Sequence, residues 1–473
     1  MKKLLGILTL LISVLTVAGS PAAAPPDPRK LTFPPLHFQV PAAERVVLEN
    51  GMIVYLLEDH ELPLISIQAY VGTGSVYEPA DKTGLAGLTG AVLRSGGTGS
   101  TAAEALDDEL EFMASSIESA IGADAGTVSM TTLTKNLDRT LQLYAQVMIA
   151  PAFREDRFIQ ARNRLIEAIR RENDDPRELA DRELAKAVYQ GHPLGRYPTV
   201  ESVGRISRDD LAAFHRRFFH PDNVILAVSG DFDREEILDK LLKAFGGWHR
   251  GSVTLPVVPP PSPVTKPAVL LVKKDIDQAV IRMGHLGIDK NNRDLHAVYV
   301  MNAILGGNGF NSRLMSVIRE KEGLAYNVNS SFQAGRRFPG TFEAETETKA
   351  ASTARAIGLM KEIITAMTRE PVSDAELSLA KESIINSFIF GFTNAASVAG
   401  QKARLEYYGY PAGYLEDFRK NIARVTKEDV LRVAGKYLHP EKMILVVAGD
   451  EKRFDRPLST FGEVREVVLE GAK

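Results

Sequence analysis

The chain has 473 residues, about three times the length of a typical domain, so a single compact core is not expected. Hydrophobic residues make up 44% and charged residues 25%, which is the balance of an ordinary globular protein and excludes a disordered, collagen-like or coiled-coil chain. The net charge of -3 favours neither nucleic acid nor anionic lipid as a partner, and the absence of cysteine excludes disulfides, thiolate nucleophiles and cysteine-bound metals.

The first residues are typical of an export signal. Lys2 and Lys3 precede an apolar run over 4–17, and small residues and prolines follow, which predicts a secretory signal peptide over 1–22. The run has 14 residues, whereas a membrane-spanning helix needs about 20, so no stable membrane anchor is expected. We expect an exported protein of a bacterial periplasm, with a Pro-rich extended arm over 23–40.

Strands and helices then follow in groups. Alternating apolar residues predict strands, and apolar residues at helical spacing predict helices. In chain order, the expected elements of the first half are strands at 45–57 and 63–71, helices at 83–94 and 102–119, a strand at 128–133, and helices at 137–148 and 154–173. Those of the second half are strands at 268–272 and 279–285, a helix at 294–305, a strand at 341–348, a helix at 352–369, and a further helix capped by Ser373 and interrupted at Gly391. This grouping indicates an α+β fold.

Two segments of the chain repeat one another. Residues 207–231 and 426–450 align without gaps, and eight of 25 positions are identical. Each copy predicts a Ser- or Thr-capped helix that His-Pro ends, followed by a buried strand that closes with Gly-Asp. A Pro-rich linker is expected at 251–267. The sequence therefore predicts an internal duplication, with homologous domains at 41–250 and 268–473.

Three runs of sequence carry a family resemblance. They are ENGMIVYLLEDHELPLISIQAYVGTGSVYEPADKTGLAGLTGAVLRSGGT from position 49, GHPLGRYPTVESVGRIS from 191 and GGNGFNSRLMSVIREKEGLAYNVNSSF from 306. Together they resemble the pitrilysin/insulinase-type zinc metallopeptidases (inverzincins), and the resemblance covers essentially all of 41–450. The chain is most similar to the small bacterial two-domain subunits of that family. The resemblance implies two homologous domains, each a mainly antiparallel sheet flanked by several helices.

The zinc motif of that family is missing from this chain. The motif is H-x-x-E-H on a helix, in which two histidines bind zinc and the glutamate activates water, while a glutamate farther along is the third ligand. The flanking Gly-Leu-Ala and Gly-Thr place Gly87 and Ala91 at the histidine positions and Gly90 at the base. The third ligand falls on Ala168, with Glu167 beside it. None of the four matched residues can bind a metal, so no metal is expected in this chain.

The remaining histidines offer no replacement for the zinc motif. His215 and His220 are five residues apart, so on a helix they point in different directions. His220 and its repeat counterpart His439 both precede proline and are expected at helix ends. His192, next to a proline, is expected in a turn. The sequence therefore predicts that the chain has no zinc catalysis of its own.

The resemblance implies a second set of functional residues in the C-terminal domain. In active members an Arg and a Tyr face the zinc, contact the substrate backbone and stabilise the tetrahedral intermediate; here they match Arg319 and Tyr326. A permanently charged donor fork and a phenol hydroxyl suit those roles. The alternative is structural: Arg319 would pair with Glu322, and Tyr326 would pack in a sheet.

A glycine loop precedes these residues. It is expected to end a helix, and the resemblance places it near the substrate entrance, so that it would contribute to substrate binding. The alternative is a simple helix cap, and the loop lacks the Lys-Ser/Thr of a phosphate loop. Its residues are Gly306, Gly307, Asn308 and Gly309.

The selective loss of the zinc positions predicts a non-zinc-binding subunit of an exported heteromeric metallopeptidase. It would be inactive alone and would bind a peptide or unfolded protein together with a homologous partner that carries H-x-x-E-H and the zinc. The assembly would be a heterodimer or larger, and the isolated chain could form a homodimer. Two alternatives stay open: a peptidase-inactive peptide-binding or scaffold protein, and a zinc peptidase with unrecognised ligands around Glu167.

Overall fold

A computed structural model describes residues 39–251, 253–264 and 266–469, and the chain from Val40 onward forms one compact unit. The predicted signal peptide and nearly all of the Pro-rich arm lie outside the described residues. Within the described ranges, no helix is both long and apolar enough to cross a membrane.

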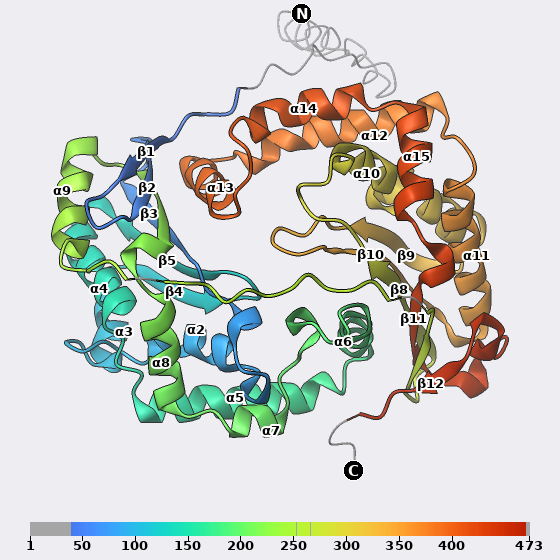
Figure 1. Cartoon of the computed structure of the whole chain (residues 1–473), viewed down its shortest axis with the longest axis horizontal. Coiled ribbons are helices and arrows are strands. Elements are labelled where there is room, and N and C mark those ends of the chain that lie inside the picture. Colours follow the sequence, from blue (N-terminus) through green and yellow to red (C-terminus); the bar gives the residue numbers. More distant parts are fainter. Residues whose placement is uncertain (1–38, 252, 265, 470–473) are drawn as a thin grey trace, which may run out of the picture. The chain divides into compact units, whose positions relative to one another are not determined.

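The first half forms one six-stranded sheet in the order β1-β2-β6-β3-β5-β4 (Figure 1). Only β2 and β6 pair in parallel, so the sheet is mainly antiparallel. In β3 every second residue from Ile65 to Val71 is buried, as the alternating pattern predicts. The strands are β1 (Glu44–Val47), β2 (Ile53–Glu58), β3 (Leu64–Val71), β4 (Ser116–Ile121), β5 (Gly126–Leu133) and β6 (Val224–Gly230).

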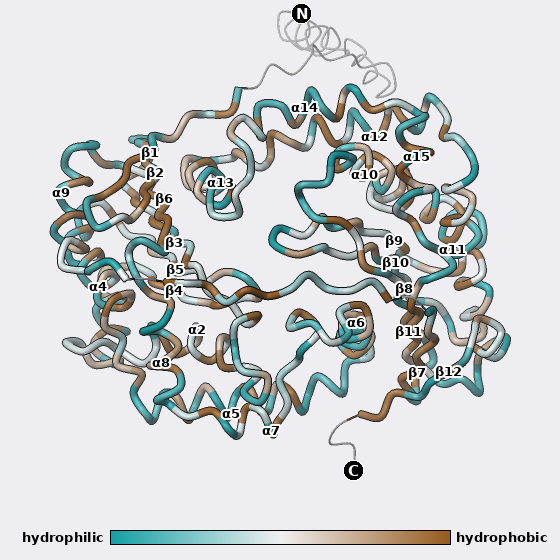
Figure 2. The backbone as a smooth tube through the Cα atoms, in the orientation of Figure 1, coloured by the Kyte–Doolittle hydropathy of each residue, from teal (hydrophilic) through white to brown (hydrophobic). Residues whose placement is uncertain are grey.

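The second half forms a sheet of matching order, β12-β7-β11-β8-β10-β9. Strands β2, β6, β3, β5 and β4 correspond in position to β7, β11, β8, β10 and β9. Figure 2 shows that β6 and β11, the strands of the sequence repeat, are hydrophobic along their length. The predicted α+β fold is confirmed, and the internal duplication remains a prediction that the matching orders support. The strands are β7 (Val269–Lys273), β8 (Gln278–Leu286), β9 (Ala325–Phe332), β10 (Thr341–Lys349), β11 (Ile444–Gly449) and β12 (Val464–Glu466).

Helices flank both sheets, and several begin at the predicted caps. Ser207 and Thr426 cap α8 and α15 through reciprocal bonds with Asp210 and Asp429, and Ser373 caps α12 in the same way. The first half has α2 (Leu85–Ser95), α3 (Ala103–Phe112), α4 (Leu137–Ile149), α5 (Glu155–Glu172), α6 (Pro176–Val188), α7 (Val200–Gly204), α8 (Arg208–Phe218) and α9 (Arg234–Phe245). The second has α10 (Leu295–Asn302), α11 (Thr353–Met367), α12 (Asp374–Ser387), α13 (Ala395–Tyr407), α14 (Tyr414–Arg424) and α15 (Lys427–Tyr437).

Each half also lends one helix to the sheet of the other. Helix α6 packs on β11 and β8, where Leu184 joins a buried cluster with Val446. Helix α13 packs on β6 and β2, where Ala403 lies against Ala227. Each sheet is therefore covered on one face by its own helices and on the other by a helix from the opposite half.

Three predicted elements differ from the structure. The strand expected over 45–57 is divided into β1 and β2 by a turn at Asn50 and Gly51. The helix expected over 102–119 ends at Phe112, because Ala114 adopts a left-handed conformation with φ of 49° and the chain turns into β4. There Ile117 and Ile121 are buried. The helix expected over 294–305 continues beyond α10 as a π-helical turn, Ala303–Gly307.

Candidate functional site

Helix α2 carries the positions that match the zinc motif. The Glu78 carboxylate accepts hydrogen bonds from the backbone N–H groups of Gly84 (3.0 Å) and Ala86 (2.9 Å), which satisfies the start of the helix. Gly87 and Ala91, one turn apart, are both exposed on the same side of α2. The helix thus presents the two histidine positions of the motif to solvent, but neither carries a metal donor.

Gly90, which matches the glutamate of the motif, lies against strand β4. A Cβ atom at Gly90 would stand 2.5 Å from the backbone nitrogen of Ile121, closer than any real contact. The Ser119 hydroxyl donates to the Gly90 carbonyl at 2.7 Å and holds the helix on the strand. Because backbone atoms occupy the space, a glutamate cannot be placed here without moving α2 away from β4.

Ala168, which matches the third zinc ligand, also has no side-chain atom that can bind a metal. Ala168 and Glu167 both lie exposed on α5, and the Glu167 carboxylate forms an ion pair with Arg170 at 2.5 Å. Within the described ranges, no group of three His, Asp or Glu side chains is placed to hold a metal ion. The residues present at the matched positions therefore do not fit a zinc ion.

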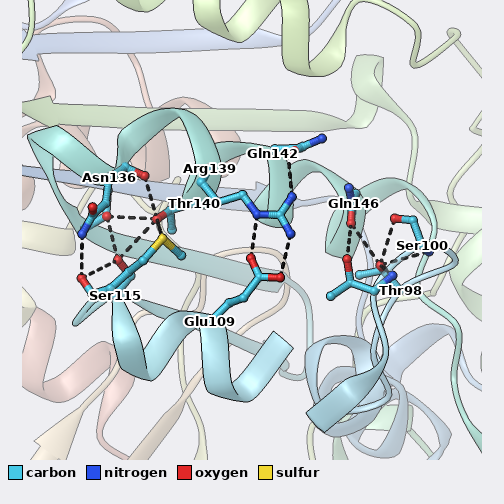
Figure 3. Close-up of polar contacts among 12 residues, drawn as sticks. Thr98, Ser100, Glu109, Ser115, Asn136, Arg139, Thr140, Gln142 and Gln146 are labelled. Atoms are coloured by element: carbon cyan, nitrogen blue, oxygen red, sulfur yellow. Dashed lines mark hydrogen bonds and ion pairs between the residues drawn. The ribbon is translucent and has the colours of Figure 1, made fainter. Parts of the chain in front are cut away.

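Hydrogen bonds and an ion pair nevertheless hold the segments around α2 together (Figure 3). After α2, the hydroxyls of Thr98 and Thr101 both donate to the Gln146 side-chain oxygen on α4 at 3.1 Å. Arg139 of α4 donates to both carboxylate oxygens of Glu109 on α3, at 2.6 and 2.7 Å. The scaffold of the motif is thus retained although its chemistry is lost.

Two histidines near α8 have structural contacts. The His215 ring donates to the Met148 carbonyl at 2.9 Å, and burial lowers its pKa to about 4. The His220 ring donates to the Arg216 carbonyl, four residues earlier, at 2.9 Å. The predicted helix-end role of His220 is therefore confirmed.

His192 and His439 also lie at chain turns. The His192 ring accepts from the Leu194 N–H at 3.2 Å and donates to the Pro259 carbonyl at 3.0 Å, which confirms the predicted turn role. His439 follows the end of α15, where its backbone N–H donates to the His285 ring at 3.2 Å. All four histidines thus make structural contacts in the fold.

Arg319 and Tyr326 lie beside each other at the edge of the second sheet. Arg319 is in the π-helical segment Met315–Lys321, and Tyr326, 84% exposed, is near the start of the edge strand β9. The Arg319 guanidinium lies 4.8 Å from the Tyr326 ring centre and 4.4 Å from that of Phe310. Glu322 pairs instead with Arg355, at 3.3 Å. The sequence did not indicate Phe310, since a single exposed aromatic residue carries no pattern.

A groove of about 710 Å³ runs beside this pair of residues. Helix α6 contributes Arg177, which binds both carboxylate oxygens of Glu347 and lowers the pKa of that carboxyl group. The buried Arg282 of β8 binds Glu345 at 3.1 Å and also contacts Asp181. Ion pairs to the neighbouring helix thus fix the wall of the groove, while Tyr326 remains exposed.

The residues of the glycine loop do not line this groove, but the loop leads into Phe310, which stacks on Arg319. A Cβ atom at Gly306 would stand 2.4 Å from the backbone nitrogen of Ser330, so only glycine permits the approach to β9. The Asn308 side-chain oxygen accepts from Ser383 at 2.8 Å, and Gly309 has φ of 52°. Gly306 and Gly307 end the helical segment, as predicted, and the chain continues directly into Phe310.

Comparisons with known proteins place this chain in a family. The model described as insulinase (peptidase family M16) matches residues 54–199, and the model described as peptidase M16 inactive domain matches 205–384. An uncharacterized zinc protease of Mycobacterium leprae is 26% identical over 403 residues, covering 84% of this chain and 89% of that protein. A non-peptidase homolog of Helicobacter pylori is 25% identical over 379 residues, covering 79% and 86%.

A solved structure gives the same result. The crystal structure of a peptidase M16 inactive domain from Pseudomonas fluorescens is similar, with a TM-score of 0.79 and 27% identity over 86% of this chain and 98% of that one. The matches extend over both sheets and over the helix that lacks the metal donors. The chain belongs to the insulinase family of peptidases, family M16, as a homologue of the inactive type.

Proposed function

We propose that this chain is the zinc-free subunit of an exported, heteromeric M16 metallopeptidase. The observation that carries the proposal is the contrast between its two halves. On α2 the motif positions lack donors and Gly90 is closed against β4, whereas Arg319 and Tyr326 stand at an open groove. A partner chain with an intact H-x-x-E-H motif would hold the zinc.

Arg319 and Tyr326 would act on the substrate. The guanidinium supplies a planar, permanently charged donor fork that suits a peptide carbonyl, and the tyrosine hydroxyl can donate to a developing oxyanion. Stacking between Phe310 and Tyr326 holds the guanidinium near the phenol ring. The edge of β9 offers unpaired backbone groups to an extended peptide.

Reconstitution with the zinc-bearing partner tests this role. The partner is the homologous chain with H-x-x-E-H that co-purifies from the periplasm of the source cells. We expect peptide cleavage by the pair, no cleavage by this chain alone, and loss of cleavage with a chelator. Arg319→Ala and Tyr326→Phe should each slow cleavage by the pair about tenfold or more without dissociating it. Arg355→Ala is the matched control and should leave cleavage unchanged, because Arg355 pairs with Glu322 and does not line the groove.

Two results would overturn the proposal. Stoichiometric zinc in the purified chain together with autonomous cleavage would favour unrecognised ligands around Glu167. Cleavage by the pair that is unaffected by Arg319→Ala and Tyr326→Phe would remove their assigned role.

The H. pylori relative described as a non-peptidase homolog supports a second candidate, a peptide-binding protein without any peptidase. That candidate predicts peptide binding but no cleavage with any partner.

A further inference from the structure

Two adjoining cavities run along α13, apart from the groove beside Arg319. One, of about 460 Å³, lies between α13 and strands β3, β5 and β6. The other, of about 590 Å³, lies between the end of α13 and the loop that joins β9 to β10. Arg404 lines both cavities. Figure 1 shows the tip of the β9–β10 hairpin reaching toward α13.

The cavity at the hairpin is basic. Arg336 and Arg337 from the hairpin and Arg404 from α13 line it, and within the described ranges none of the three pairs with a carboxylate. Arg336 lies 4.9 Å from the Tyr408 ring centre, and Arg337 lies 4.7 Å from that of Tyr407. Arg337 and Arg404 are half-buried and Arg336 is exposed. Cations that form no ion pair favour an anionic ligand.

The single carboxylate in this lining is that of Asp124, which attracts Arg336 and Arg337 but forms no ion pair with them within the described ranges. One of its side-chain oxygens accepts from the Tyr408 hydroxyl at 2.9 Å. Its backbone carbonyl accepts from the Tyr407 hydroxyl at 2.8 Å and from the Arg337 Nε at 3.3 Å. The three arginines therefore outnumber the one acid, and the lining keeps a net positive charge.

The cavity at the sheet is polar but carries little charge. Hydroxyl and amide groups of β3, β5 and β6 line it, and α13 adds Gln401. The Gln401 side-chain oxygen is buried and has no hydrogen-bond partner among the residues that the structure describes. A buried acceptor without a donor is unfavourable, so an N–H group of a ligand would be stabilised there. The lining groups from the strands are Ser66, Gln68, Ser129, Thr131 and Ser229.

We propose that the two cavities form one site for a peptide segment that ends in, or carries, a carboxylate. The peptide backbone would lie in the cavity at the sheet, with an N–H donating to Gln401. The carboxylate would lie among Arg336, Arg337 and Arg404. This inference rests on the proposed role of the chain in holding a peptide, and it adds the charge of the ligand that the chain selects.

Peptide binding to the isolated chain tests the site without any partner or cleavage. The probes are three peptides of one neutral ten-residue sequence with an N-terminal fluorophore: a free acid, a C-terminal amide, and an amide with Asp at the last position. Fluorescence anisotropy should show the free acid binding about tenfold or more tightly than the plain amide. Equal tightness of the Asp amide would show that the site also accepts a side-chain carboxylate, and weak binding of the Asp amide would show that it requires the chain terminus. Equal affinity of all three peptides would overturn the proposal.

Variants locate the effect within the chain. Arg404→Gln and Arg336→Gln should each reduce the preference for the carboxylate to about threefold or less. Arg205→Gln, at an exposed arginine directly after α7, should preserve it. Gln401→Leu should weaken the acid and the amide equally, since it removes a backbone contact. A preference that persists in both arginine variants would overturn the site. Failure of the cleavage test with retained carboxylate preference would instead remove only the peptidase role.

Discussion

The close approach of α2 to β4 predicts opposite effects of one added methyl group at two positions of the same helix. In Gly87→Ala the new Cβ meets no atom within 4 Å. Alanine is favoured over glycine inside a helix by about 0.5–1 kcal/mol, so this variant should be more stable than the parent chain. In Gly90→Ala the Cβ would lie 2.5 Å from the Ile121 nitrogen and 2.9 Å from the Ala120 carbonyl carbon, and overpacking costs about 1–3 kcal/mol.

The propensity gain is common to both variants, so their difference measures the steric cost alone. Urea unfolding followed by circular dichroism should therefore give free energies of unfolding that differ by about 1–3 kcal/mol between the two variants, with equal denaturant slopes. Equal stabilities would refute the close approach and, with it, the reason why the glutamate of the motif cannot return. The approach also predicts that Gly87→His with Ala91→His folds, because both positions are exposed, whereas Gly90→Glu does not.

Three further predictions concern the stability of the fold. Burial lowers the pKa of His215 and of His285 to about 4, below the value near 6.5 of an unfolded chain, so stability is fully present above pH 6.5 and falls as the pH drops toward 4. Each histidine should contribute about 2 kcal/mol to the loss of unfolding free energy between pH 7 and pH 5. Urea unfolding at a series of pH values measures this loss, and an unchanged loss in His215→Leu would contradict the role of His215. Gln146→Leu leaves two threonine hydroxyls without their acceptor and should lower the free energy of unfolding by about 1–3 kcal/mol, whereas the exposed Gln142→Leu should change it by less than about 0.5 kcal/mol. Tyr407→Phe removes the hydroxyl whose nearest acceptors are the Asp124 carbonyl at 2.8 Å and the Val71 carbonyl at 3.2 Å, and it should cost about 1 kcal/mol in the same assay. An unchanged midpoint would show that the hydroxyl does not contribute to stability.

The sequence predicted the elements whose signals are local. The capping pairs at Ser207 and Thr426 and the alternation of β3 were both found, because a cap or a half-buried strand is encoded within a few residues. The start of β4 was assigned to a helix. The residues before it have good helical spacing, and the left-handed Ala114 that ends α3 has no glycine to signal it.

The candidate sites were likewise predicted where the signal is local and missed where it is not. The vacancy at Gly87, Gly90 and Ala91 followed from one short motif, but the contact that excludes a side chain at Gly90 depends on β4, about thirty residues later. The stacking of Phe310 on Arg319 and the gathering of arginines around α13 were not predicted. Such contacts join segments far apart in the chain, and one sequence carries no signal for them.

The exchange of α6 and α13 has a consequence for how this protein folds. Neither half is an autonomous folding unit, because each sheet would leave an apolar face exposed without the helix from the opposite half. These contacts join residues about eighty or more positions apart, so their formation is expected to be slow and to come after synthesis of most of the chain. Fragments cut within 251–267 should aggregate separately and recover a folded complex only when they are refolded together. A chain that resembles two linked domains is thus a single cooperative structure.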